Sequence, residues 1–246
     1  MRSKFFVVII LFLAQLASTC ITAATNAFLE AGIPAADREW RGSDYMLAAQ
    51  IFTDGKVTLP RFSDEQGSLL LERLTSIENF SFQRNKTLPF GSRMEDYLNL
   101  TQGANSILKL YLTAANKGKD VHKEMARLQA FELHVAALGV ELVDEFMPTI
   151  PKDDKYAVRM DGLKKMYSGL TTVFVGAEAS LTERKFSPDD KSTMLEAMTN
   201  TLPQIKKTFS ADYAVELRKK LESDKSKFKS NDDINRINKM LAELGN

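Results

Sequence analysis

Cysteine and histidine are scarce in this 246-residue chain, which contains one cysteine and two histidines. Thiolates and imidazoles are the main protein ligands of zinc and other transition metals, so the composition argues against such a site. His122 and His134 fall on one predicted helix about 18 Å apart along its axis, too far to share an ion unaided. A single cysteine also excludes a disulfide within the chain. No metal and no cofactor is expected.

Acidic residues offer only a weak substitute for those missing ligands. Glu141, Asp144 and Glu145 cluster near the end of the predicted helix that carries His134. Carboxylates on a helix surface are usually solvated, and a lone histidine is more often partly buried than bound to a metal. We therefore expect solvated acids here rather than a ligand set.

Sequence motifs of the common enzyme classes are also missing. The chain has no Gly-x-Ser-x-Gly, no Gly-x-x-x-x-Gly-Lys and no dinucleotide fingerprint. Each of these motifs sits where a strand meets a helix, and strand-like alternation is scarce in this sequence. Ser106 and Lys109 match a Ser-x-x-Lys pattern, but its companion motifs are absent and the pair falls within a predicted helix. No catalytic residue is predicted.

An excess of either charge is lacking as well. The chain has 33 basic and 32 acidic residues, and the lysines near the C-terminus are interspersed with acids. Such a pattern is typical of a solvated helix face, whereas nucleic-acid binding depends on a basic surface. We expect no nucleic-acid partner and no anionic-lipid surface.

The first 24 residues, by contrast, have the pattern of a secretory leader. Arg2 and Lys4 precede an unbroken apolar run from residue 5 to residue 13, and small residues continue to Ala24. A basic, an apolar and a small-residue region in this order are typical of signal peptides. We expect cleavage between residues 20 and 24. The alternative is a retained anchor, since about 20 residues are just long enough to cross a bilayer.

Lipidation of Cys20 is a less favoured alternative. Bacterial lipoproteins carry a leucine three residues before the modified cysteine, and this chain has Ala17 there. We predict a signal peptide or N-terminal anchor at 1–24 and a single α-helical domain at 25–246. The mature protein is expected to be exported, to the periplasm or outside the cell. It would contact a membrane only through residues 1–24, if these are uncleaved or lipidated.

Helix signals recur through the rest of the chain, with polar caps, acids in first turns and apolar residues at every third or fourth position. We expect Ser63 and Ser92 to cap two of the helices and Pro203 to kink or divide a third. Residues 79–91 are predicted to be the longest irregular segment. The predicted helices cover residues 43–54, 63–76, 92–116, 120–146, 153 or 154 to 182, a segment from 187, 210–228 and 231–245.

These elements predict an all-α fold, a helical bundle of long antiparallel helices with additional shorter helices at both ends. Three consecutive helices of about seven turns with apolar stripes pack most economically side by side. The similar openings at 151–155 and 188–191 also hint at a helical repeat, but acids at helix starts are general electrostatics. A solenoid is therefore the less favoured alternative.

Gly162, Gly169 and Gly176 recur every seven residues along one predicted helix and so share a face. Glycine inside a helix costs up to about 1 kcal/mol relative to alanine, so some other interaction should offset it. The favoured explanation is the close approach of a neighbouring helix. The alternative is that these glycines line a groove for an apolar ligand.

Trp40, the only tryptophan, stands next to Arg41 and near Tyr45. Exposed, these residues would form a partner contact, because tryptophan, tyrosine and arginine concentrate binding energy at interfaces. The favoured alternative is that Trp40 anchors the N-terminal segment onto the bundle. Three glycosylation sequons begin at Asn79, Asn85 and Asn99, and they matter only in a eukaryotic host.

The favoured functional hypothesis is a non-enzymatic binding module for a protein or an envelope component. The second is a carrier of a small apolar ligand in a cavity between helices, lined by methionine and phenylalanine. An enzyme with an unfamiliar active site is the third.

Overall fold

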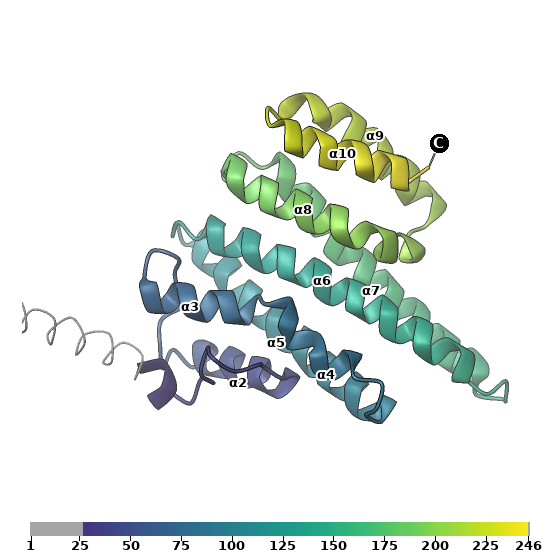
Figure 1. The fold of residues 1–246 in the computed structure, drawn as a ribbon, viewed down its shortest axis with the longest axis horizontal. Coiled ribbons are helices and arrows are strands. Elements are labelled where there is room, and N and C mark those ends of the chain that lie inside the picture. Colours follow the sequence, from purple (N-terminus) through teal and green to yellow (C-terminus); the bar gives the residue numbers. More distant parts are fainter. Residues whose placement is uncertain (1–26, 246) are drawn as a thin grey trace, which may run out of the picture.

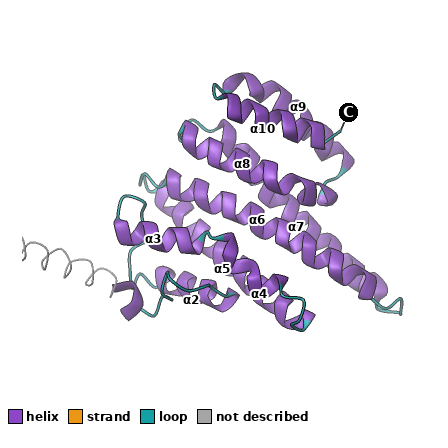
Figure 2. Ribbon diagram, viewed as in Figure 1, coloured by secondary structure: helices purple, strands orange, loops and turns teal. Residues whose placement is uncertain are grey.

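The computed structural model describes residues 27–245, and every regular element within them is a helix (Figure 2). The predicted all-α class is therefore confirmed. The predicted leader at 1–24, including Cys20, lies outside the described residues. Among the described helices, none has the length and apolar character needed to span a membrane.

The helices keep the labels of Figure 1. They are α2 (Gly42–Thr53), α3 (Glu65–Leu74), α4 (Ser81–Arg84), α5 (Phe90–Asn116), α6 (His122–Phe146), α7 (Tyr156–Thr182), α8 (Pro188–Ile205), α9 (Ala211–Asp224) and α10 (Asn231–Glu243). Short 3₁₀ turns connect some of them: η1 (Ile77–Phe80), η2 (Met147–Thr149), η3 (Lys206–Thr208) and η4 (Lys225–Lys227).

Several helix ends follow from local chemistry. Ser187 forms the expected cap of α8, because its hydroxyl accepts from the backbone of Asp190 and the Asp190 carboxylate accepts in return. Gly55 and Gly118 follow the ends of α2 and α5 in the left-handed region, with φ of +68° and +81°. Glycine adopts this conformation without steric cost, so these two ends were predictable.

Other boundary predictions were wrong. Asp64 rather than Ser63 caps α3, since its carboxylate accepts from the backbone N–H of Gly67 at 2.7 Å. Helix α5 begins at Phe90, ahead of Ser92. Pro203 does not divide α8, which continues past it to Ile205.

The segment 79–91 is also more regular than predicted. η1 and α4 occupy its first half, and α5 has already begun at residue 90. Phe80 packs in the core, 5.5 Å from the ring centroid of Phe131, and this contact holds the short helices against α6.

Helices α5, α6 and α7 run antiparallel, as the sequence predicts. Arg93 and Tyr97 near the start of α5 lie against Glu145 and Gly139 near the end of α6. Gln129 near the start of α6 donates to Ser180 near the end of α7 at 3.0 Å.

Helices α6, α8 and α10, in contrast, run parallel to one another (Figure 1). The ends of α6 and α8 are joined by Asp144 and Lys207, whose ion pair measures 2.5 Å. The starts of α8 and α10 are joined by the hydrogen bond from Ser192 to Asp233 at 2.8 Å. α7 packs against both α6 and α8, so the chain alternates between two layers from α6 onward.

The two similar openings in the sequence do not occupy equivalent positions in this layering. Residues 151–155 precede α7, whereas residues 188–191 open α8, and these two helices run in opposite directions in different layers. The resemblance between the two openings therefore reflects acids at helix starts.

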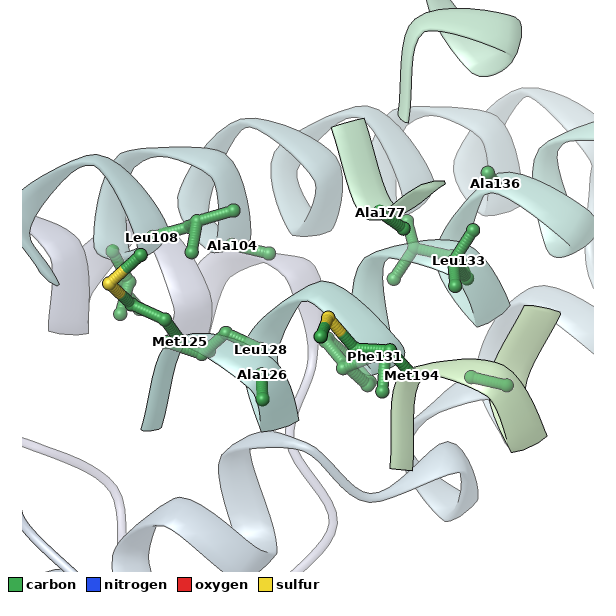
Figure 3. Close-up of a cluster of buried hydrophobic side chains, with 14 of the residues drawn as sticks. Ala104, Leu108, Met125, Ala126, Leu128, Phe131, Leu133, Ala136, Ala177 and Met194 are labelled. Carbon is green, nitrogen blue, oxygen red and sulfur yellow. The ribbon is translucent and has the colours of Figure 1, made fainter. Parts of the chain in front are cut away.

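The core runs continuously through these layers (Figure 3). Met125 and Leu128 of α6 point toward Leu108 of α5, and Phe131 lies beside Met194 of α8. α6 is buried on nearly all sides, which makes it the central element of the fold.

Candidate functional site

The predicted partner contact at Trp40 and Tyr45 is wrong, because both side chains are 0% exposed. Trp40 lies edge-on to Tyr45 at 5.5 Å, and Tyr45 stacks on Phe131 of α6 at 5.8 Å. The Trp40 indole donates to the carbonyl of Ala35 at 3.2 Å. The alternative is confirmed: Trp40 anchors the N-terminal segment to the core.

Arg41 remains partly exposed but is fully engaged within the chain. Its guanidinium lies over the Phe82 ring, 3.0 Å from the centroid, and its Nε donates to Asp96 at 3.2 Å. A side chain held by both an aromatic face and a carboxylate ties α2 to α4 and α5. It is a poor candidate for a partner contact.

The glycine face on α7 is open. Gly162, Gly169 and Gly176 are exposed, and a Cβ added to any of them would meet nothing within 4 Å. The prediction that a neighbouring helix of this chain approaches them is therefore wrong, and the face does not form the wall of a closed groove. Helices approach closely at other glycines instead, where an added Cβ would clash: Gly42 against Asp96, Gly103 against Tyr45, and Gly139 against Tyr97.

The acids near the end of α6 are paired with cations. Glu141 binds Arg84 at 3.0 Å, and Glu145 binds Arg93, which lowers the pKa of Glu145 by hydrogen bonding to its ionised form. No three histidine or acidic side chains in residues 27–245 are grouped so that they could hold a metal ion.

Of the three sequons, Asn79 is fully buried. Its amide donates to the Tyr45 hydroxyl and the Arg73 carbonyl, both at 2.7 Å, and its oxygen accepts from the Trp40 amide at 3.0 Å. Asn79 therefore bridges the start of α2 to η1 and is closed to modification in the folded protein. Asn85 is exposed, and Asn99 lies within α5.

A second surface feature is a polar groove along α6, here called the α6 groove. It consists of two adjoining cavities of about 370 and 330 Å³, which share the lining residues Glu72, Arg127 and Thr193. α6 forms its floor, α3 and η1 one wall, and α8 the other.

Small side chains explain why the groove is open. Ala126 and Ala130 of α6 and Ala197 of α8 are buried beneath it, where larger side chains would fill the space. The groove follows α6 from Lys123 to His134, which corresponds to about 16 Å at 1.5 Å per residue.

The rim of the groove carries more acids than bases. Five carboxylates line it, against Lys123 and Arg127. Arg127 donates to the Thr75 hydroxyl at 3.2 Å, and Lys123 lies 5.0 Å from the centroid of the Phe62 ring. The five acids are Glu72, Glu78, Asp189, Asp190 and Glu196.

Two of these acids, Glu72 and Asp189, form no ion pair within the described residues. Glu78 and Glu196, by contrast, pair with Arg73 and Arg236. The groove therefore offers unpaired negative charge on both of its walls.

His134 closes one end of the groove. Burial lowers the pKa of its imidazole, and the nearby positive charges of Arg84 and Arg127 lower it further. His134 is thus neutral near pH 7, and among the described residues it makes no hydrogen bond to a hydroxyl or an acid. A nucleophile–base pair needs such a bond, and the described residues around His134 do not provide one.

The sequence reasoning missed the α6 groove. Its floor depends on alanines, which are ordinary helix formers, and its walls come from helices far apart in the chain. The one available signal was His134 with polar residues near it in the sequence. This signal does not show which other helices pack beside α6 and form the walls.

No protein-family model matches the chain, and neither a curated protein nor a solved structure matches it. The class of protein is therefore defined by the fold and the groove alone: a two-layered all-α protein with an open polar groove.

Proposed function

We propose that the protein is a non-catalytic binding module of the periplasm or the extracellular space, and that its α6 groove holds an extended basic segment of a partner protein. The observation that carries this proposal is that the two adjoining cavities together extend over three turns of α6. A groove about 16 Å long accommodates about five residues of extended chain.

Charge supports a basic rather than an acidic occupant. Acids outnumber bases on the rim, and Glu72 and Asp189 stand unpaired on opposite walls. Complementary charge raises association rates and selects against partners of like charge. An extended peptide with alternating lysines presents them on one face, which matches an acidic rim.

The proposal is tested by fluorescence anisotropy with a labelled hexapeptide of alternating lysine and alanine. Its counterpart with glutamate in place of lysine is the charge control. The lysine peptide should bind, more weakly as salt rises, and the glutamate peptide should not. Equal binding of the two peptides, or no binding of either, would overturn the proposal.

Thr193→Trp fills the groove where its two cavities meet, and Thr172→Trp on the exposed side of α7 is the matched control. Both threonines donate to the carbonyl four residues earlier, so the two variants lose the same local bond. We expect Thr193→Trp to weaken the lysine peptide by about tenfold or more, since the groove's contacts are lost together. Thr172→Trp should not change the affinity, and equal effects of the two variants would contradict a groove site.

A further inference from the structure

A separate cavity of about 310 Å³ lies where the end of α7, the start of α8 and the connection from η4 to α10 meet. It shares no lining residue with the α6 groove. Its volume is near the lower end of the range for small-molecule sites, about 300 to 1,000 Å³. The cavity therefore suits a small ligand better than a polypeptide.

One side of the cavity is apolar. Leu181 and Phe186 line it and are almost fully buried, while Phe228 is half-buried beside them. Phe186 is fixed edge-on against the His122 ring at 5.5 Å. These side chains offer a preformed surface for an alkyl chain.

The other side of the cavity is basic. Lys191, Lys227 and Lys229 line it, and only Lys227 is paired, with Asp224 at 2.5 Å. The ammonium groups of Lys191 and Lys229 make no ion pair or hydrogen bond with any described residue. Two lysines without a side-chain partner thus line one small cavity.

The single carboxylate of the lining does not cancel this charge. Asp233 accepts from Ser192 at 2.8 Å and from Arg236 at 3.0 Å, and it shares Arg236 with Glu196, so its charge is partly offset. Ser230 also lines the cavity and precedes the first residue of α10. Its side chain does not accept a hydrogen bond from the first N–H groups of this helix. These groups attract an anion, against the opposing charges of Asp232 and Asp233 in the same turn.

We propose that this cavity binds an anionic amphiphile with a short alkyl chain. Its carboxylate lies between Lys191 and Lys229, and its chain lies against Leu181, Phe186 and Phe228. The sequence alone suggested a solvated helix face here, because it did not show that the neighbouring acids Asp224 and Asp233 pair with Lys227 and Arg236. The site is independent of the α6 groove.

Isothermal titration calorimetry with decanoate below its micelle concentration tests the proposal. Decyltrimethylammonium keeps the chain but reverses the charge, and acetate keeps the charge but removes the chain. Decanoate should bind, and the other two should not bind measurably. Equal binding of decanoate and decyltrimethylammonium would show adsorption through the chain alone and would overturn the proposal, as would the absence of decanoate binding.

The double variant Lys191→Gln/Lys229→Gln locates the site. Lys117→Gln/Lys119→Gln removes the same charge from the exposed connection between α5 and α6 and is the matched control. Decanoate should bind at least about tenfold more weakly to the first variant, because the carboxylate loses both of its charged partners, and its binding to the control should be unchanged. Phe228→Ser should also weaken decanoate. Equal loss in both lysine variants would show a general charge effect and would overturn the site.

Discussion

Glu132 of α6 is a buried carboxyl group that should make the stability of the protein depend on pH. Its side chain is 8% exposed, and its Oε1 has no hydrogen-bond partner. Burial raises its pKa from 4.5 to about 7, because removal from water disfavours the charged form, while Lys109 of α5 opposes the shift. The unfolded chain keeps the ordinary value.

The sign follows from proton binding. Between about pH 4.5 and pH 7 the folded state keeps the proton of Glu132 while the unfolded state releases it, so stability falls as pH rises. The rise of the pKa from 4.5 to about 7 corresponds to about 3 kcal/mol. This penalty is absent below that range and complete above it.

Glu132→Gln removes the titration and keeps the shape, so it should gain stability over the wild type by about 3 kcal/mol between pH about 4.5 and about 8. Urea unfolding followed by circular dichroism at several pH values measures this difference. Glu95→Gln on the exposed side of α5 is the control and should show no such trend. A Glu132→Gln difference that stays constant with pH, or falls as pH rises, would refute the reasoning.

Urea unfolding of further variants tests the packing. Gly169→Ala should stabilise by up to about 1 kcal/mol, because the exposed glycine gains helix propensity at no steric cost. Gly103→Ala should destabilise, since its Cβ would collide with the backbone of α2, and a stabilised variant would contradict the close approach. Asn79→Ala should cost more than about 2 kcal/mol by leaving the buried Trp40 amide without an acceptor, whereas Asn85→Ala should be nearly neutral; similar losses at both would contradict that role.

The sequence predicted the long helices well because their boundaries depend on residues at or next to each helix end. Gly118 ends α5, Ser187 caps α8, and apolar residues at threes and fours mark the buried faces. The parallel pairing of α6 with α8 was not predicted, although α6 carried a signal for it. Alanines such as Ala126 and Ala137 make this helix apolar on nearly every side, and such a helix must be covered by several neighbours.

The functional residues were harder to predict because they depend on which faces meet. The sequence around Trp40 favoured an anchor over a partner contact, but only its burial decides between them. The spacing of Gly162 and Gly169 correctly placed them on one face of a helix. Whether another helix covers that face depends on the packing, which the spacing does not show. The close approaches between helices occur at Gly42 and Gly103 instead. Both cavities likewise combine residues from three segments of the chain.

The most direct test of the groove is nuclear magnetic resonance of methyl-labelled alanine during titration with the unlabelled lysine–alanine hexapeptide. Ala126, Ala130 and Ala197 lie beneath the α6 groove, whereas Ala48 and Ala114 are buried elsewhere. The proposed function predicts that the first three methyl signals shift together along one binding curve while the other two stay in place. Shifts confined to Ala48 and Ala114, or no shift at any of the five, would contradict it.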